Sequence, residues 1–403
     1  MKPNQPRKGR GAVSNLQGRF ETLRREEFDD GWGVPAEAEG ALGVLGEGET
    51  FTTGGVDLGE PGAAGDGAGD ALPPLRTTVT RETAKSILTR NDSPDIPFRV
   101  SINPYRGCEH GCIYCFARPS HSYLGLSPGL DFESRLFAKV NAPQLLRAAL
   151  AAKNYQPEVI ALGVNTDAYQ PVERELRITR GILEVLHEAR HPVALITKSS
   201  LIERDLDLLV PMAARNLVAA TVTITTLDHD LARSLEPRAA SPTRRLRVLR
   251  TLAEAGVPVF VSVSPLIPFV NDNELESILE ACAEAGAKGA HYIVMRLPWE
   301  LNDVFQEWLR AHFPLRAERV MNRIRDLRGG KDYDSSFGKR MSGEGIWADL
   351  LRQRFAAACA RTGISAKRGN TLALDTCQFV WPAPPLTSPV PSASDKGQLD
   401  LFG

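Results

Sequence analysis

The 403-residue sequence has no run of about eighteen apolar residues, so it predicts no membrane-spanning helix. Its start, MKPNQPRKGRGAVSN, lacks the apolar middle of a secretory signal. Only six cysteines occur in the chain, which are too few for a disulfide scaffold. These absences together predict a protein of the cytoplasm, where thiols stay reduced.

An excess of one charge is also missing, because 48 Lys and Arg oppose 49 Asp and Glu. Any basic surface must therefore be local. Residues 316–340 carry eight Lys and Arg interleaved with Tyr333 and Phe337, and SPTRRLRVLR (241–250) adds four arginines without an acid. Basic residues with aromatics can hold phosphates and stack bases. The alternative is that these are ordinary solvated helix faces.

Aromatic residues are scarce in residues 1–75, which are rich in Gly and Ala. Such a stretch buries too little apolar area to offset its ordering entropy, so we predict a mostly disordered N-terminal region. Its basic piece KGRGA (8–12) could be an anchor or part of a solvated tail. We further predict a core over 76–300, a helical extension over 301–380 and a flexible tail over 381–403.

Six short β-branched runs alternate with segments of helical period in the predicted core. The runs cover 98–105, 158–166, 192–199, 217–225, 257–265 and 289–297, and helical segments cover 171–190, 241–256 and 273–286. Apolar strands separated by helices indicate a parallel sheet that is covered on both faces. The sequence therefore predicts an α/β fold, a full or partial β/α barrel, with its chemistry after the strands' carboxyl ends.

Three cysteines, Cys108, Cys112 and Cys115, follow the first strand with the spacing C-x3-C-x2-C. Thiolate sulfur suits iron–sulfur clusters or zinc. A [4Fe–4S] cluster held entirely by protein needs four cysteines, so three leave one iron with an open position. The alternative is a zinc site with His110 or His121 as fourth ligand, although zinc sites usually contain paired C-x2-C units.

The cysteine loop and the later motifs resemble the radical S-adenosylmethionine (SAM) enzymes, in particular their spore photoproduct lyase-like branch. The motifs are KGRGA, SPDIPFRVSINPYRGCEHGCIYCFARPSH, GLDFE, NTDAYQPVE, ITKSSLIERD, TITTLD, LEPRA and VSPLIPF. The resemblance implies a partial (β/α)6-type TIM barrel with a [4Fe–4S] cluster on Cys108, Cys112 and Cys115. It also implies reductive cleavage of SAM to a 5′-deoxyadenosyl radical, with an electron donor such as flavodoxin or ferredoxin.

The resemblance also implies roles for polar residues near the strand ends. Thr166 and Asp167 match a polar trio that contacts SAM, Lys198 matches a lysine near its carboxylate, and Thr223 takes the place of a serine. Further pocket candidates are Gln170, Glu173, Glu236 and Arg238. Without the resemblance, each could be a loop cap or a surface ion pair, and Glu236-Pro237-Arg238 could form a structural ion pair.

The resemblance implies the cofactors but not the photoproduct reaction. The related lyase cuts a thymine dimer cross-link in DNA with a cysteine as hydrogen donor, and Val164 takes that place here. Cys282 is predicted to be a buried helix thiol, whereas Cys359 or Cys377 could approach in space. We predict a DNA repair or modification enzyme acting on nucleic acid. Alternatives are the same chemistry on a protein or small molecule, or a non-enzymatic iron–sulfur or zinc module.

The final motif is Gln398-Leu399-Asp400-Leu401-Phe402, which matches the pentapeptide that docks bacterial repair proteins on the sliding clamp. In an extended tail, Leu401 and Phe402 would enter an apolar pocket while Gln398 forms a hydrogen bond. The alternative is a terminal apolar patch that folds back on the barrel.

Overall fold

The computed structural model describes residues 6–22, 50–53, 75–366 and 373–381. Its main sheet has the strand order β11-β10-β9-β8-β7-β4-β3. Six strands run parallel: β4 (Val100–Ile102), β7 (Ile160–Leu162), β8 (Val193–Thr197), β9 (Val218–Thr223), β10 (Val259–Leu266) and β11 (Gly289–Val294). The edge strand β3 (Leu88–Arg90) is antiparallel. All six predicted strands are present, and the sheet forms the predicted partial barrel.

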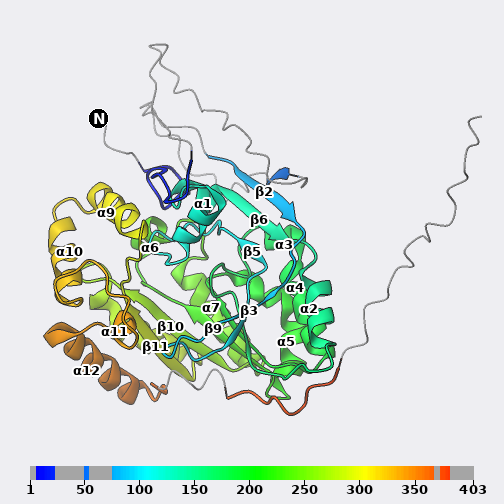
Figure 1. Cartoon of the computed structure of the whole chain (residues 1–403). Helices are drawn as coiled ribbons and strands as arrows, with labels where there is room; N and C mark the ends of the chain where they lie inside the picture. The colour runs from blue at the N-terminus through cyan, green and yellow to red at the C-terminus, as the bar shows by residue number, and fades with distance from the viewer. Residues whose placement is uncertain (1–5, 23–49, 54–74, 367–372, 382–403) are drawn as a thin grey trace, which may run out of the picture.

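The helices cover the outer face of this sheet and extend beyond it. They are α1 (Leu130–Ser134), α2 (Ala142–Leu150), α3 (Glu173–Leu176), α4 (Ile178–Glu188), α5 (Leu206–Ala213), α6 (His229–Leu235), α7 (Pro242–Glu254), α8 (Leu275–Glu284), α9 (Leu301–His312), α10 (Ala317–Asp326), α11 (Lys339–Ser342) and α12 (Gly345–Thr362), with 3-10 helices η1 (Arg118–Leu124), η2 (Ser200–Asp205) and η3 (Asp272–Glu274). Figure 1 shows α2, α4 and α5 on one side and α9, α10 and α12 on the other.

Alternate residues of the parallel strands face opposite sides, as the pleat requires. Val222 and Val261 belong to the large hydrophobic core shared with the helices. The intervening residues form a polar row, in which Thr223 pairs in register with Ser262 and Ser262 with His291. The inner face of the partial barrel is therefore polar near the strands' carboxyl ends.

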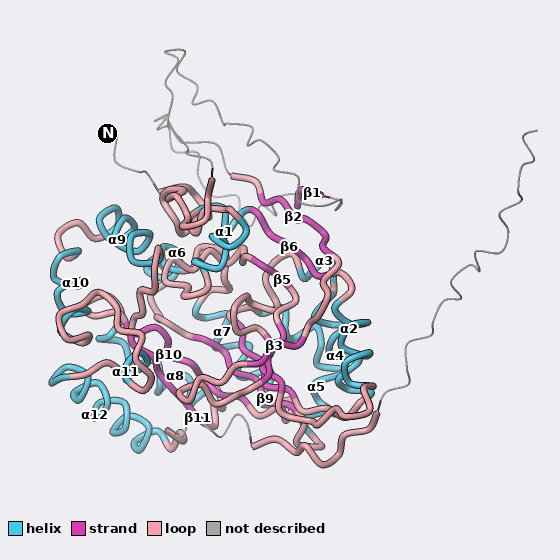
Figure 2. Tube along the Cα trace, in the orientation of Figure 1, coloured by secondary structure: helices cyan, strands magenta, loops and turns pink. Residues whose placement is uncertain are grey.

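A second, smaller sheet has the order β1-β2-β6-β5 and was not predicted, because its strands are short. They are β1 (Thr50–Thr53), β2 (Thr77–Glu82), β6 (Arg135–Lys139) and β5 (Tyr105–Arg106). Figure 2 shows β2, β6 and β5 together, next to α1. Since β5 ends two residues before Cys108, this sheet fixes the start of the cysteine loop.

The C-terminal extension is helical, as predicted, and shares a second hydrophobic core with the cysteine loop. This core joins Ile113 and Tyr114 to Trp308 of α9 and to residues of α10. Trp308 is fully buried, stacks on Phe305 and donates from Nε1 to the Ser234 carbonyl at 3.1 Å. The extension is therefore part of the site's support.

Trp308→Ala is expected to lower the free energy of unfolding by about 3–5 kcal/mol, because it leaves a large cavity in this second core. Denaturant titration measures the change. Trp381→Ala is the matched control, since that ring is 56% exposed and its loss should change stability by at most about 0.5 kcal/mol. Equal effects of the two substitutions would contradict this account of the core.

Several sequence predictions concern residues that the structure does not describe. The predicted disorder of residues 23–49 and 54–74, and the pentapeptide Gln398–Phe402, lie outside the described residues. Within the N-terminal region, however, residues 10–13 are buried, so a solvated tail is the wrong interpretation of KGRGA. In the described part of the chain, no helix is long and apolar enough to cross a membrane.

Candidate functional site

The cysteine loop lies between β5 and η1, at the carboxyl edge of the sheet. Cys108 and Cys112 are buried, Cys115 is half-buried, and all three are free thiols. The backbone N–H of Cys108 donates to the Phe132 carbonyl at 2.9 Å, and that of Cys115 donates to the Cys112 carbonyl at 3.2 Å. Burial raises the pKa of the Cys112 thiol to about 12. A bound cation would be needed to keep such a thiol ionised at neutral pH.

Arg118 supports the backbone of the cysteine loop and is completely buried. Its guanidinium donates to the carbonyls of Cys112 at 2.9 Å and Gly111 at 3.0 Å, and it forms an ion pair with Glu133. Glu133 also accepts from the backbone N–H groups of residues 11 and 12, at 2.9 and 2.8 Å. A buried ion pair is tolerated when the remaining donors and acceptors of both groups form hydrogen bonds in this way.

The segment KGRGA packs against Glu133 and against Gly111 of the cysteine loop. Arg10 donates from Nη1 to the Glu133 carbonyl at 2.7 Å and from Nη2 to Oγ1 of Thr77 at 2.8 Å. Gly11 lies so close to the loop that a Cβ there would be 1.9 Å from the Gly111 carbonyl oxygen. Glu133 lies in the GLDFE motif, from which no role for it could be predicted.

Asp167 connects the cysteine loop with the loops that follow β7 and β8. Its Oδ1 accepts from Oγ1 of Thr197 at 2.7 Å, its Oδ2 accepts from the Lys198 N–H at 2.7 Å, and Nδ1 of His110 lies 3.3 Å from Oδ2. Burial alone would raise the pKa of Asp167, but the adjacent His110 and these hydrogen bonds lower it to about 2. Asp167 is thus a fixed negative charge whose oxygens already have protein partners.

Thr166 and Lys198 lie beside this carboxylate. Thr166 donates from Oγ1 to the Tyr105 carbonyl at 3.2 Å. The Lys198 ammonium lies 5.7 Å from the centre of the Tyr114 ring and forms no ion pair with a described carboxylate. Burial alone would lower the pKa of Lys198, but Cys112, Glu236 and Asp167 raise it. Lys198 is therefore a cation available to an anionic ligand.

Glu236 and Arg238 each form an ion pair, as the structural alternative proposed, but with other residues instead of with each other. Glu236 is buried, pairs with Arg245 and accepts from the Tyr114 hydroxyl. Arg238 pairs instead with Glu109 at 2.9 Å. Arg245 also donates to the carbonyl of Thr223 at 2.8 Å, and this bond fixes the end of β9. These groups hold the cysteine loop against α6 and α7.

The remaining pocket candidates also have partners in the chain. Gln170 accepts from the Glu109 N–H at 2.9 Å and donates to the Gly107 carbonyl at 3.2 Å, so it supports the cysteine loop. Glu173 accepts from the Tyr105 hydroxyl at 2.5 Å and pairs with Arg204 at 2.8 Å. Sequence spacing located both residues near the site, but it could not show that they act as supports.

None of the other cysteines lies at the carboxyl edge of the sheet. Cys282 is buried in α8, as predicted. Cys359 is buried in α12, within the large hydrophobic core. Cys377 is exposed in a segment whose residue Asp375 hydrogen-bonds to Asn216, before β9 begins. The expectation that Cys359 or Cys377 could approach the site is therefore wrong.

The two histidines offered as zinc ligands have other neighbours. His110 lies against Asp167, and Nε2 of His121 is 2.9 Å from the Arg135 carbonyl oxygen. Among the described residues, no three His, Cys, Asp or Glu side chains converge as the ligands of one metal ion would. Thiolates that bind different irons of a cluster need not converge on one point.

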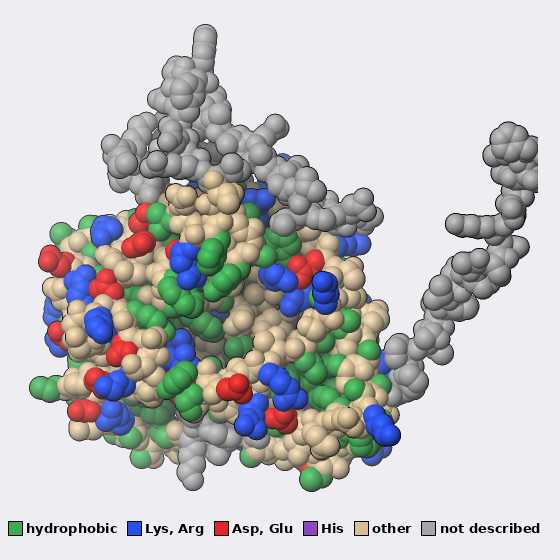
Figure 3. All heavy atoms as spheres, viewed as in Figure 1, with side chains coloured by type: hydrophobic (Ala, Val, Ile, Leu, Met, Phe, Trp, Pro, Cys, Tyr) green, Lys and Arg blue, Asp and Glu red, His purple; other side chains and the backbone are tan. Residues whose placement is uncertain are grey.

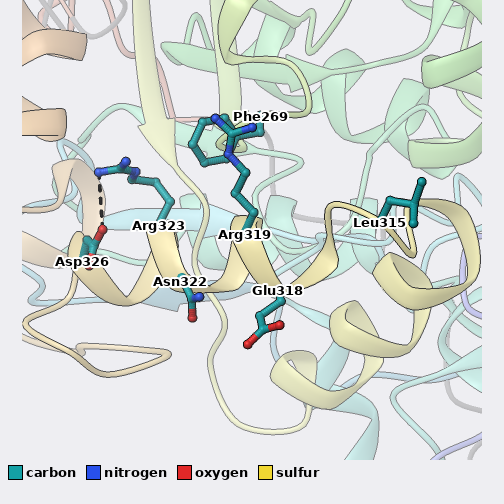
Figure 4. Close-up of a pocket in the computed structure, with 7 residues that line it drawn as sticks. All are labelled: Phe269, Leu315, Glu318, Arg319, Asn322, Arg323 and Asp326. Carbon is teal, nitrogen blue, oxygen red and sulfur yellow. Dashed lines mark ion pairs between the residues drawn. The ribbon is translucent and has the colours of Figure 1, made fainter.

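A separate pocket of about 410 Å³ lies between the loop after β10 and helix α10. Figure 4 shows the Arg319 guanidinium against the Phe269 ring and the ion pair of Arg323 with Asp326. The Arg319 Cζ atom is 4.0 Å from the centre of the ring. None of the residues predicted to bind the cluster or SAM lines this pocket, and its charges are mixed, so the cysteine loop remains the candidate site.

The comparisons with known proteins agree with this geometry. Residues 102–282 match the family model of the radical SAM superfamily. The chain belongs to the radical SAM superfamily. An uncharacterized protein of Mycobacterium tuberculosis is 34% identical over 270 residues, which cover 66% of this chain and 75% of the relative. An uncharacterized protein of Methanocaldococcus jannaschii is 28% identical over 223 residues, which cover 55% of this chain and 79% of that protein.

Solved structures share the fold of this radical SAM enzyme. Spore photoproduct lyase complexed with dinucleoside spore photoproduct matches with a TM-score of 0.50 and 14% identity, over 72% of this chain and 80% of that one. Enzymes of this superfamily use a [4Fe–4S] cluster and SAM, which are therefore the cofactors here.

The residues of the site fit these two cofactors. Three free thiols in one loop match the number of protein ligands that leaves one iron of a [4Fe–4S] cluster open, and the loop's backbone is fixed by hydrogen bonds on two sides. Lys198 offers a cation without a described ion-pair partner, which suits the SAM carboxylate. The polar row Thr223, Ser262 and His291 begins beside it on the inner face.

Proposed function

We propose that Cys108, Cys112 and Cys115 hold the cluster and that Lys198 binds the carboxylate of SAM. When bound, the cluster supplies the electron that cleaves SAM and so generates the radical chemistry of the superfamily. Asp167 orients Thr197 and Lys198 through its hydrogen bonds. Thr166 and Thr223 line the approach to the polar inner face. Glu236 with Arg245, and Arg238 with Glu109, position the loop instead of touching the cofactor.

The observation that carries this assignment is the anchoring of a three-cysteine loop beside an ammonium group. Four thiolates would saturate the cluster, whereas three leave a position for a ligand from solution. The Lys198 ammonium lies 5.7 Å from the ring centre of Tyr114, a residue between Cys112 and Cys115, and its charge acts to lower the pKa of the Cys112 thiol. The anchoring hydrogen bonds keep the thiols in place before the cofactors bind, which lowers the ordering cost of binding.

Asp167→Asn is expected to weaken SAM binding by at least about tenfold, because an amide N–H₂ would face the Lys198 N–H in place of an acceptor. Isothermal titration of the reconstituted enzyme measures the dissociation constant. The iron content should stay near that of the unsubstituted enzyme, which separates a positioning role from loss of the cluster. Asp228→Asn is the control, because asparagine can still cap α6. Unchanged SAM affinity in Asp167→Asn would contradict the positioning role.

We infer that the substrate is nucleic acid, modified or repaired by a reaction other than spore photoproduct cleavage. The shared fold with spore photoproduct lyase and the polar inner face support this class. Val164 stands where the related lyase has its cysteine, and Cys282, Cys359 and Cys377 all lie elsewhere. The hydrogen donor must therefore be another group.

The basic stretch 316–340 contributes less to this inference than its composition suggested. Five of its eight cations form ion pairs or hydrogen bonds within the chain: Arg323, Arg325, Arg328, Lys339 and Arg340. In the second stretch, Arg244 and Arg245 pair with Glu203 and Glu236. Charge alone therefore does not mark the surface that would bind a nucleic acid.

The test of the substrate class is substrate-dependent hydrogen transfer into 5′-deoxyadenosine. Reconstituted enzyme is reduced with SAM in the presence of deuterated oligonucleotides, damaged DNA and modified RNA first. Deuterium in the recovered 5′-deoxyadenosine identifies a substrate. Transfer only from a peptide or a small molecule would support the same chemistry on another class and would contradict the nucleic-acid proposal.

A further inference from the structure

The cysteine loop is bordered by exposed aromatic side chains that none of the proposed chemistry uses. The described residues include six exposed aromatic side chains: Phe20, Phe116, Tyr123, Trp299, Phe337 and Trp381. Four of them, Phe20, Phe116, Tyr123 and Trp299, lie on segments at the carboxyl edge of the sheet, and we name these four the aromatic rim. Large apolar side chains gathered in water usually mark a binding surface.

Three rings of the rim surround one guanidinium. The Arg19 Cζ atom lies 4.3 Å from the centre of the Trp299 ring, 5.4 Å from that of Phe20 and 5.7 Å from that of Tyr123. Phe20 and Tyr123 are stacked, with ring centres 5.1 Å apart. The rings thus present flat apolar surfaces with a cation between them.

The group is fixed in place by Glu300. Arg19 donates to Oε1 of Glu300 from Nε at 2.6 Å and from its backbone N–H at 3.1 Å, and Ser122 donates to the same oxygen at 3.1 Å. Glu300 therefore ties the N-terminal segment to η1. Such a surface is ordered before a ligand arrives, so less entropy is lost on binding.

Trp299 combines an exposed ring with an unusual backbone conformation. Its φ is 48°, in the left-handed region that bulky residues rarely adopt, and its side chain is 61% exposed. Strained backbone at a non-glycine residue is often associated with function. The strain also places this ring within reach of Arg19.

The fourth ring of the rim is that of Phe116, which follows Cys115 in the sequence and has a guanidinium over its face. Arg296 lies over Phe116 with 5.3 Å from Cζ to the ring centre, and it pairs with no described carboxylate. Burial, together with the nearby Arg296, lowers the pKa of Arg328 to about 10. In Figure 3, charges of both signs are mixed over the visible face, while hydrophobic side chains gather in its upper middle.

We propose that the aromatic rim stacks unpaired nucleobases of a single-stranded nucleic acid, with Arg296 contacting a phosphate, beside the cysteine loop. This rests on the proposed nucleic-acid function and specifies the form that the substrate takes. Every base offers a π-face, so exposed rings with interleaved guanidiniums bind single strands without reading sequence. Paired bases inside a duplex do not offer these faces, so the rim prefers single strands.

The test compares two tryptophans of similar exposure in the full reconstituted enzyme. Trp299→Leu removes a ring of the rim. Trp381→Leu removes a ring that is 56% exposed and lies outside the rim, since the N–H of the adjacent Val380 donates to the carbonyl of Ala189, just after α4. Binding of a fluorescein-labelled oligothymidylate is followed by anisotropy. We expect about tenfold weaker binding for Trp299→Leu and unchanged binding for Trp381→Leu. Iron content and melting temperature check that both variants fold.

Arg296→Gln gives an independent measurement. If Arg296 contacts a phosphate, the slope of log K against log salt concentration should fall by about 0.7. The unsubstituted enzyme should also bind the single strand more tightly than a duplex of the same sequence. A preference for the duplex, or an unchanged salt slope together with unchanged affinity in Trp299→Leu, overturns the rim proposal.

The possible results distinguish a failure of the rim proposal from a failure of the proposed nucleic-acid function. If the unsubstituted enzyme binds the oligonucleotide and Trp299→Leu binds equally well, the rim proposal fails and the nucleic-acid function stands. If the enzyme binds neither single strands nor duplexes, both fail, while SAM cleavage is unaffected. If Trp299→Leu keeps its oligonucleotide affinity but slows cluster reduction by flavodoxin, the rim is a protein-docking surface and the proposal is overturned.

Discussion

Replacing Cys108, Cys112 or Cys115 singly with alanine is expected to abolish formation of 5′-deoxyadenosine. Each substitution removes one of only three thiols in the loop, and no other cysteine lies near enough to replace it. A cluster that lacks one of its protein ligands is lost or assembles incompletely. The measurement is chromatography of the products after anaerobic reconstitution, reduction and addition of SAM.

Cys377→Ala is the matched control for these substitutions. Cys377 is exposed and lies in a segment that is hydrogen-bonded near the opposite end of the sheet, so its loss should leave the yield of 5′-deoxyadenosine unchanged. An unchanged yield in any of the three loop variants would refute the assignment of that cysteine as a ligand.

Gly11→Ala is expected to reduce the iron retained after reconstitution severalfold and to reduce SAM cleavage in proportion. The new Cβ would lie 1.9 Å from the Gly111 carbonyl oxygen, which is main-chain and cannot swing aside. Either the N-terminal segment must leave its place on Glu133 or the cysteine loop must move. Iron and sulfide analysis of the purified variant measures the effect.

Gly9→Ala serves as the control for this clash, because it is the same substitution two residues away. A Cβ at Gly9 would meet nothing within 4 Å, although φ is 74°, so the cost is limited to about 1–2 kcal/mol of backbone strain. If Gly11→Ala retained as much iron as Gly9→Ala, the N-terminal segment would not support the loop.

The sequence could predict features that depend on neighbouring residues. Short apolar runs predict the six parallel strands. Gly256 and Gly286 predict the ends of two helices, and the structure gives them φ of 82° and 92°. The cysteine spacing likewise lies within eight residues, so the loop could be identified without knowledge of its surroundings. The resemblance to radical SAM enzymes came from the same local motifs.

The supports of the site could not be predicted because their partners are far apart in the chain. Glu133 binds the backbone of residue 11 across 122 residues, and Tyr114 donates to Glu236 across the same separation. Glu236 and Arg238 illustrate the difficulty, since the resemblance implies a place for both near SAM, and only the structure shows their ion pairs with Arg245 and Glu109. Burial and hydrogen bonds distinguish a residue that supports the loop from one that contacts a cofactor. Neither property can be read from the sequence.

The aromatic rim could not be predicted from the sequence for the same reason. Phe20, Tyr123 and Trp299 come from three distant parts of the sequence and meet only around Arg19. Nothing in their local sequences indicates exposure, because isolated aromatic residues are usually buried.

The most direct test of the account concerns the iron that has no protein ligand. The reduced, reconstituted enzyme is examined by electron paramagnetic resonance before and after SAM is added, with ¹⁷O in the carboxylate of SAM. The account predicts that the cluster spectrum changes on addition and shows hyperfine coupling to the labelled oxygen. An identical spectrum without coupling, or zinc in place of iron and sulfide, would contradict it.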